Sequence, residues 1–140
     1  MSNTIIIYGS DTQNTSDVAE LIAEFWGDEV PLQDIRNTKP KEFEDYTHFV
    51  LGIPTWDNGE LQSDWFHFLD KLDDIDFTGK TVAIFGLGDQ AGYPYTFLDA
   101  MGILYEKVCE QGATVVGQWP ADSYEFEESK ALIDGQLVGL

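Results

Sequence analysis

Residues 49–59 read Phe-Val-Leu-Gly-Ile-Pro-Thr-Trp-Asp-Asn-Gly, and they say more about the architecture than any other stretch. Phe49–Ile53 is a continuous apolar run of strand length. A strand that is apolar on both faces is typical of a parallel sheet covered by helices on both sides. Pro54 is expected to end this strand, and Asn58-Gly59 favours a tight turn soon after it.

On either side of this stretch, apolar runs alternate with segments of helical periodicity. We expect further strands at Thr4–Tyr8, Glu29–Leu32, Thr81–Phe85 and Val115–Gly117, and helices at Ser16–Trp26, Gln62–Leu69 and Thr96–Gln111. The side chains expected to face inward from the first two helices are Val18, Leu21, Ile22, Phe25, Trp65, Phe66 and Leu69. Alternating strands and helices imply parallel pairing through right-handed crossovers, so residues 1–140 are expected to form a single α/β domain.

The charge is strongly acidic. The chain has 26 Asp and Glu residues against 7 Lys and Arg, a formal net charge of −19. This balance argues against nucleic acid or an anionic membrane as a partner. It favours a basic protein partner, although acidity that only keeps the protein soluble remains the alternative.

Other residue types limit the chemistry further. Cys109 is the sole cysteine, which excludes an internal disulfide, and with His48 and His67 as the only histidines we expect no metal site. The first residues lack a basic signal-peptide region, and no apolar stretch approaches membrane-spanning length. We therefore expect a cytoplasmic protein.

Ligands of open parallel sheets bind beyond the carboxyl ends of the strands, so the loops there are the first places to look. The loop Ser10–Thr15 leaves the first strand and enters a helix. The hydroxyls of Ser10, Thr12 and Thr15, with the free amides of the helix start, favour an anion such as phosphate. No Lys or Arg occurs before Arg36, so neutral donors would hold it. Simple helix capping is the alternative.

Two other loops bring exposed aromatic residues to the same edge. Trp56, just past a strand end, could stack on a flat ring or could cover a neighbouring helix. The loop Gly86–Tyr93 is glycine-rich, but its spacing departs from that of a dinucleotide-binding fingerprint. Its glycines let the backbone approach a ligand, and Tyr93 supplies a second ring. Together the three loops predict a flat ring between Trp56 and Tyr93, with its phosphate on the first loop.

At these residues the chain resembles the flavodoxins, and more closely their long-chain group. Ser10–Thr15 is similar to the family's Thr-x-Thr-Gly-x-Thr loop, residues 54–62 to its Pro-Thr-Trp loop, and Gly86–Tyr93 to its Gly-x-Gly-Asp-Gln-x-Gly-Tyr loop. Trp119–Leu140 resembles the insertion of long-chain members. The resemblance implies a flavodoxin-like, doubly wound, five-stranded parallel sheet of order 2-1-3-4-5, with its last strand split by an insertion. It also implies a tightly held, non-covalent flavin mononucleotide (FMN).

The resemblance further implies a role for individual residues. Trp56 and Tyr93 would enclose the isoalloxazine, Asp89 would lie near its pyrimidine edge, and the Asp57–Asn58 peptide would turn to meet the flavin N5 proton after one-electron reduction. No catalytic residue is implied. The complete set of expected FMN-binding residues is Ser10, Asp11, Thr12, Gln13, Asn14, Thr15, Pro54, Thr55, Trp56, Asp57, Asn58, Gly59, Leu87, Gly88, Asp89 and Tyr93.

Two departures from the family pattern stand out. Gln13 replaces the usual Gly of the phosphate loop, so this position must avoid positive φ or accept strain of about 1 kcal/mol. Long-chain flavodoxins also continue beyond the stretch matching Leu137–Leu140 and end in a helix that covers one face of the sheet. This sequence stops there, so we expect the usual last helix to be lacking. Either the chain is naturally short, another element covers that face, or the sequence is a fragment.

The implied function is that of a low-potential one-electron carrier, a ferredoxin substitute that is monomeric and not an enzyme. The implied partners are basic redox proteins such as ferredoxin–NADP reductase and an electron donor such as photosystem I. We expect acidic residues beside the second loop to attract them: Asp57, Glu60, Asp64, Asp70, Asp73, Asp74 and Asp76.

Three alternative functions are compatible with parts of this pattern. An FMN-dependent reductase would need a substrate cavity over the flavin, which Trp56 and Tyr93 would fill. A flavodoxin-like activator of a metalloenzyme would share the cofactor and differ only in its partner. A signalling receiver domain has the same strand order, but it needs an Asp where this chain has Gly52-Ile53-Pro54 and a Lys where it has Gln118-Trp119.

Overall fold

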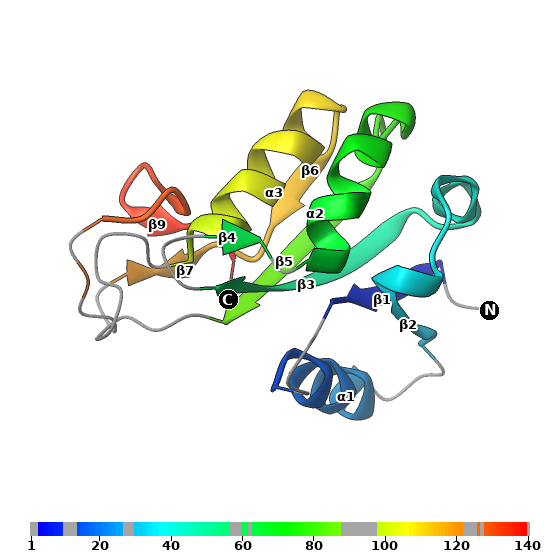
Figure 1. The fold of residues 1–140 in the computed structure, drawn as a ribbon, viewed down its shortest axis with the longest axis horizontal. Coiled ribbons are helices and arrows are strands. Elements are labelled where there is room, and N and C mark those ends of the chain that lie inside the picture. Colours follow the sequence, from blue (N-terminus) through cyan, green and yellow to red (C-terminus); the bar gives the residue numbers. More distant parts are fainter. Residues whose placement is uncertain are drawn as a thin grey trace.

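A twisted parallel sheet forms the centre of the computed structural model (Figure 1). The structure describes residues 3–9, 14–26, 30–56, 60–61, 63–87, 98–121, 126 and 128–139. Within them, the parallel strands lie in the order β2-β1-β3-β5-β6, which confirms the expected order 2-1-3-4-5 for successive parallel strands. The strand bounds are β1 Thr4–Tyr8, β2 Leu32–Asp34, β3 His48–Trp56, β5 Thr81–Leu87 and β6 Thr114–Val116.

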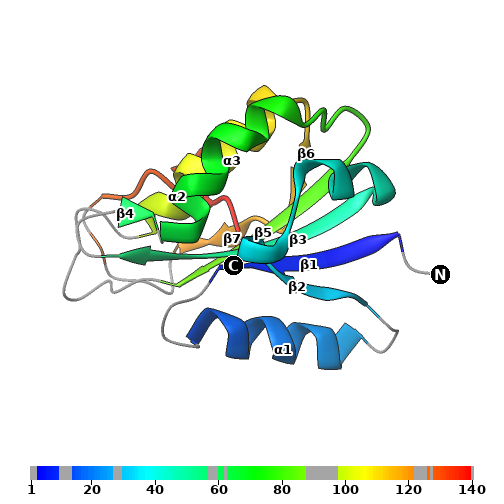
Figure 2. The same ribbon diagram turned by 45° about the vertical axis from the view of Figure 1, so that its right-hand side comes forward.

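The helices cover both faces of the sheet. Among the described residues, α1 lies on one face and α2 and α3 lie on the other (Figure 2). Their bounds are α1 Asn14–Trp26, α2 Ser63–Leu69 and α3 Asp99–Glu110, with short 3₁₀ helices η1 Ile35–Asn37, η2 Pro40–Asp45 and η3 Asp70–Asp74. The chain therefore crosses one face between β1 and β2 and the other face between β3 and β5. This change of face makes the boundary between β1 and β3 the topological switch point.

Alternate residues of each strand supply the two halves of the core. In β1, Ile5 and Ile7 face α2 and α3, whereas Ile6 faces α1, and each of the three is at most 2 % exposed. The larger half holds an aromatic cluster in which Phe43 stacks on Phe49, with ring centroids 5.1 Å apart. Burial on both faces explains the continuous apolar runs Ile5–Ile7 and Phe49–Ile53 at the centre of the sheet.

The chain leaves the parallel sheet after β6. Residues 119–137 contribute a small antiparallel sheet of β7 Trp119–Pro120, β8 Leu132–Ile133 and β9 Gln136–Leu137, in the order β7-β9-β8. This segment packs on α3, where the Asp99 side chain accepts a hydrogen bond from the Lys130 amide at 2.7 Å. Residue 139 then lies close to Ile84 of β5.

Four of the predicted strands have other bounds in the structure. The fourth runs on from Phe85 to Leu87, and the fifth is Thr114–Val116 rather than Val115–Gly117. The second strand is Leu32–Asp34 rather than Glu29–Leu32. The third strand does not end before Pro54 but runs on to Trp56, where it turns into the antiparallel strand β4 Glu60–Leu61. Proline is tolerated there because β1 ends opposite Gly52, so no strand on that side needs the missing N–H.

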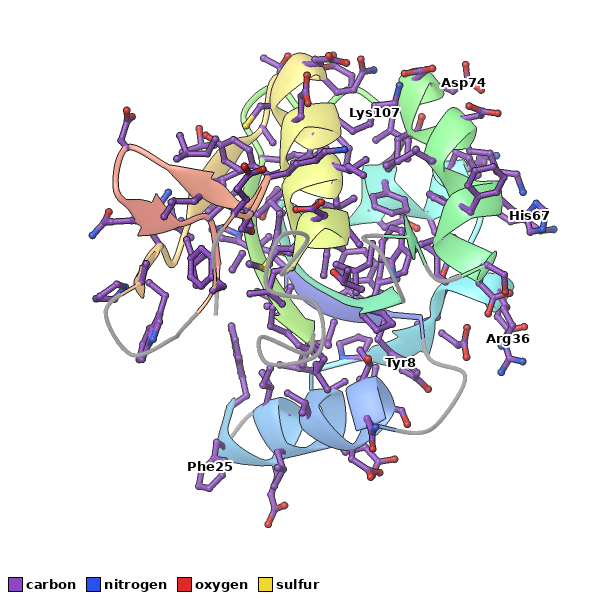
Figure 3. The ribbon with its side chains drawn as sticks, turned by 60° about the vertical axis from the view of Figure 1, so that its left-hand side comes forward. Tyr8, Phe25, Arg36, His67, Asp74 and Lys107 are labelled. Atoms are coloured by element: carbon purple, nitrogen blue, oxygen red, sulfur yellow. The ribbon has the colours of Figure 1, made fainter. Side chains whose placement is uncertain are left out.

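The inward faces of two helices were predicted only in part. Val18 and Ile22 of α1 pack against the core as expected, but Leu21 is 52 % exposed and Phe25 is 84 % exposed. Figure 3 shows Phe25 on the side of α1 that points away from the sheet. Buried Thr15 and Ala19 form the contact instead. The second helix differs in the same way.

In α2, Trp65 and Phe68 are the buried residues, Leu69 is half-buried, and Phe66 is 63 % exposed. The apolar positions of both helices span more than one face. Periodicity cannot tell which part of so wide an apolar arc meets the sheet.

Candidate functional site

The carboxyl ends of three neighbouring strands meet at one edge of the sheet. Tyr8 of β1 lies opposite Gly52 of β3, and Gly52 lies opposite Phe85 of β5. One residue past β1, the Gly9 amide donates to the Gly52 carbonyl at 3.2 Å. The three loops predicted from the sequence all leave from these strand ends, so the structure brings their starting points together.

The first turn of α1 borders the phosphate loop. Asn14 is exposed at the start of the helix and Thr15 is 1 % exposed, whereas Ser10, Asp11, Thr12 and Gln13 lie outside the described residues. Helix α1 is 13 residues long and begins at Asn14, directly after the predicted phosphate loop. The N–H groups of a helix's first turn have no partner within the helix itself. The donors here are amides and hydroxyls, a set that fits a phosphate group without a cation.

The second loop is a hairpin, and its two strands are described. Thr55 pairs with Leu61, and the backbone of Trp56 pairs with that of Glu60. The Thr55 hydroxyl oxygen accepts a hydrogen bond from the Ala100 amide at 3.1 Å, which ties the end of β3 to the start of α3. Asp57, Asn58 and Gly59 lie outside the described residues.

The third loop begins beside the second. Leu87, half-buried at the end of β5, lies opposite Pro54 of β3. Gly88, Asp89 and Tyr93 lie outside the described residues, so the stacking of a ring between Trp56 and Tyr93 stays a prediction. The described members of the predicted site that meet at this edge are Asn14, Thr15, Pro54, Thr55, the backbone of Trp56, and Leu87.

A charged group at the same edge was not predicted from the sequence. Arg36, in η1 directly after β2, donates to the Asp34 carboxylate at 2.9 and 3.2 Å, and its Nε lies 3.8 Å from the Asp64 carboxylate. The bond to Asp34 raises the pKa of Arg36 above its ordinary value, so the guanidinium stays charged. The signal available in the sequence was that Arg36 is the first basic residue of the chain.

Tyr8 lies near this group, as Figure 3 shows. Burial raises the pKa of the Tyr8 phenol, and the negative charges of Asp34 and Glu20 raise it further. The hydroxyl is therefore neutral at physiological pH and keeps its proton. It provides a neutral donor at the carboxyl end of β1.

The expected acidic cluster beside the second loop does not form as predicted. Helix α3 begins at the Thr55 hydroxyl and ends near Gln111, whose side-chain amide donates to the carbonyls of Asp73 and Ile75 at 2.9 Å each. A helix of 12 residues is about 18 Å long, so the acidic residues of η3 lie about that far from the hairpin.

These distant acidic residues surround a shallow hollow. Its volume is about 270 Å³, and it is lined by Asp73, Asp74, Ile75, Asp76, Glu110 and Gln111. Figure 3 shows Asp74 and Lys107 together at this end, away from Tyr8. Asp70, Asp73, Asp74 and Asp76 thus lie at the opposite end of the helices. Asp64 is the member of the predicted cluster whose described side chain lies at the site edge. The error arose because α2 and η3 carry the chain back along the sheet.

Within the described part of the chain, no three His, Cys, Asp or Glu side chains gather closely enough to hold a metal ion. Nor does any described helix have the length and apolar character needed to cross a membrane. The start of α1 and the carboxyl ends of β1, β3 and β5 thus lie at one edge of the sheet, where parallel sheets bind their ligands.

Known proteins resemble this chain over nearly its whole length. The family model described as flavodoxin matches residues 6–136. A flavodoxin of Synechocystis sp. is 50% identical over 142 aligned positions, which cover 100% of this chain and 84% of the relative. Flavodoxin 2 of Escherichia coli is 48% identical over 141 positions, covering 99% and 82%.

Solved structures agree with these relatives. The crystal structure of Fusobacterium nucleatum flavodoxin bound to flavin mononucleotide superimposes with a TM-score of 0.93 at 33% identity, covering 100% of this chain and 84% of that one. A point mutant of the same flavodoxin, also bound to flavin mononucleotide, gives a TM-score of 0.92 at 34% identity, covering 98% and 81%.

Proposed function

The chain belongs to the flavodoxin family, and from this premise we propose that it carries single electrons at low potential between redox proteins on one non-covalently bound FMN. The observation that carries the proposal is the match of residues 6–136 to the family, which includes all three loops at the carboxyl edge of the sheet. The donor chemistry at that edge fits the ligand. The amide and hydroxyl donors at the start of α1 suit the phosphate, and the neighbouring strand ends suit the flat ring.

Each loop has one task in this proposal. The phosphate is bound by the first turn of α1 with Thr15, together with residues 10–14. Trp56 and Tyr93 would hold the ring, and the peptide between Asp57 and Asn58 would offer it a hydrogen bond. When bound, FMN supplies two successive one-electron transfers, which no side chain of the protein can provide.

The protein lowers the potential through its charge. The fully reduced flavin is an anion, and a chain of formal charge −19 disfavours an added negative charge. Nearby carboxylates act most strongly because coulombic energy falls with distance and is screened by salt. Asp64 at the site edge is partly neutralised by Arg36, so the acidic residues of the hairpin itself, Asp57 and Glu60, carry more of the effect.

The partners follow from the same charge. We propose basic redox proteins, ferredoxin–NADP reductase as acceptor and photosystem I as donor, with brief contacts and fast association. We further propose that the protein acts in the cytoplasm as a monomer and that it catalyses no reaction of its own. Association should slow as ionic strength rises, because the attraction is between charged surfaces.

An FMN titration followed by a potentiometric titration tests the proposal. The apoprotein should quench the fluorescence of one equivalent of FMN, and the bound flavin should be reduced in two separate one-electron steps. A protein that leaves FMN fluorescence unchanged would refute the cofactor. Rapid turnover of a quinone with NAD(P)H alone would instead assign the protein to the flavin reductases. A rate of electron transfer to a reductase that did not change with salt would refute the basic partner.

A further inference from the structure

Arg36 lies between two carboxylates that belong to different elements. One oxygen of Asp34 accepts the Arg36 backbone amide at 2.8 Å, and the other accepts both Nη2 at 2.9 Å and Nε at 3.2 Å. On its other side, Nε lies 3.8 Å from Asp64 in the first turn of α2. The Asp34 side chain is 10% exposed and that of Arg36 61%. The guanidinium is therefore fixed from its buried side and reaches outward to α2.

Arg36 thus forms a bridge from Asp34 to Asp64, and other bonds hold the Asp34 end of this bridge in place. The Thr38 hydroxyl donates to the Asp34 carbonyl at 2.9 Å. The Gln33 side-chain amide in turn donates to the Thr38 hydroxyl at 2.8 Å and to the Glu42 carboxylate at 3.0 Å. These bonds join β2, η1 and η2 into one unit. Asp34 is thus the fixed point to which Arg36 attaches α2.

The first turn of α2 in turn fixes the position of the hairpin formed by β3 and β4. Leu61 of β4 pairs with Thr55, and α2 begins only two residues later, at Ser63. The other anchor of this turn is the Trp65 indole, which donates to the Gly52 carbonyl at 2.8 Å. The returning strand of the hairpin therefore starts from an element whose first turn contacts both β3 and η1.

We propose that Arg36 is a positioning residue for the FMN crevice, because it attaches the first turn of α2 to the end of β2. The inference rests on the proposed function, since it concerns the hairpin that carries Trp56 and the peptide after Asp57. Loss of the bridge removes the contact of Asp64 with η1 and leaves two like charges, Asp34 and Asp64, near each other. The hairpin then samples positions in which it meets the flavin less well.

A purely electrostatic effect of Arg36 on the flavin must be separated from this positioning. Two variants keep the net charge and break the bridge. R36K keeps the positive charge but loses the planar fork that contacts both carboxylates. R36Q/D64N removes one charge of each sign. If Arg36 acted only through its charge, both variants would behave like the wild type.

The matched control is the double variant K107Q/D73N. Lys107 and Asp73 form an ion pair of 2.8 Å at the opposite end of the helices, near the distant hollow. Its replacement removes the same two charges as R36Q/D64N. It leaves β2, the first turn of α2 and the hairpin untouched.

The measurements are the Kd of FMN by fluorescence quenching and the gap between the two one-electron potentials. We expect R36Q/D64N to raise the Kd of FMN about tenfold and to narrow the gap between the two potentials. R36K should change both quantities in the same direction but less. K107Q/D73N should leave both at their wild-type values. Wild-type values in both R36K and R36Q/D64N would overturn the inference, as would an equal effect in the control. A wild-type protein that binds no FMN would overturn the proposed function itself.

The unfolding midpoints of the apoproteins complete the comparison. Exposed ion pairs contribute little to stability, so all three variants should remain folded by circular dichroism. If weaker FMN binding merely followed a lower unfolding midpoint across the three variants, Arg36 would be structural only and the inference would fail.

Discussion

The ring of Phe85 lies directly against the backbone of Gly52 in the neighbouring strand. The two residues are paired in the parallel register, and a Cβ atom on Gly52 would lie 2.7 Å from each Cε atom of the ring. Phe85 is 3% exposed and packs with Ile6 and Val50 under α1. The Gly52 carbonyl also accepts bonds from the Gly9 amide and the Trp65 indole. Gly52 thus contacts three elements at once: the end of β1, the first turn of α2 and strand β5.

The substitution G52A should destabilise the apoprotein by about 1–3 kcal/mol, because the added methyl group overlaps the ring and the ring has little room to move. Chemical denaturation measures the change. The control is G52A in an F85A background, where the cost should fall because the ring is absent. An equal cost in both backgrounds would show that the ring is not what excludes a side chain at position 52.

Trp65 should be sensitive to substitution, whereas its neighbour Phe66 should not. Trp65 is fully buried, and W65F removes its 2.8 Å bond to Gly52 together with part of the ring, so we expect a loss of about 2–4 kcal/mol in the free energy of unfolding. Phe66 is 63% exposed, and F66L should stay within about 0.5 kcal/mol of the wild type. Similar losses for both variants would contradict this orientation of α2.

The architecture and the place of the site could be predicted from the sequence, because both depend on local patterns. Fully apolar runs such as Thr81–Phe85 fit strands buried on both faces, and parallel strands place their carboxyl ends at a single edge. The start of α1 and the two strands of the hairpin lie at that edge as expected. The strands and the places where the loops leave them are thus encoded within short segments, whereas the strand order was implied by the family resemblance of the loops.

What could not be predicted depends on contacts between distant segments. Phe25 has helical spacing with Ile22, yet only Ile22 meets the sheet. Asp64 and Asp73 are close in sequence, but α2 and η3 carry them to opposite ends of the fold. The bridge from Arg36 to Asp64 spans 28 positions, and no periodic pattern signals it.

Asp99 should hold the C-terminal segment on α3. It is 6% exposed, and its carboxylate accepts the Lys130 amide at 2.7 Å. D99A leaves that amide without its partner and should cost about 1–3 kcal/mol, whereas D99N keeps an acceptor oxygen and should cost less. Hydrogen exchange at Lys130 and Ala131 provides the measurement. Unchanged exchange in D99A would refute this role.

Asp76 should add stability that disappears in acid. Hydrogen bonds from the Thr78 side chain and from its backbone amide lower the pKa of Asp76 below its ordinary value. A carboxyl group whose pKa is lower in the folded state stabilises above its unfolded pKa, and this contribution is lost as pH falls through the folded pKa. The difference in unfolding free energy between wild type and D76N should therefore be constant above about pH 5 and shrink from about pH 4 downward. A difference that grew in acid would have the wrong sign.

Thr55 should link FMN binding to the start of α3. Its hydroxyl oxygen accepts the Ala100 amide, so T55V, which keeps the shape of the side chain, leaves that amide unpaired where the helix begins. We expect the apoprotein to lose about 1–2 kcal/mol. We also expect the Kd of FMN to rise, because β3 and α3 border the second and third loops. T55S keeps the acceptor and should restore both quantities. Restored stability without restored FMN affinity would show that the methyl group of Thr55, rather than its bond to α3, matters to the ligand.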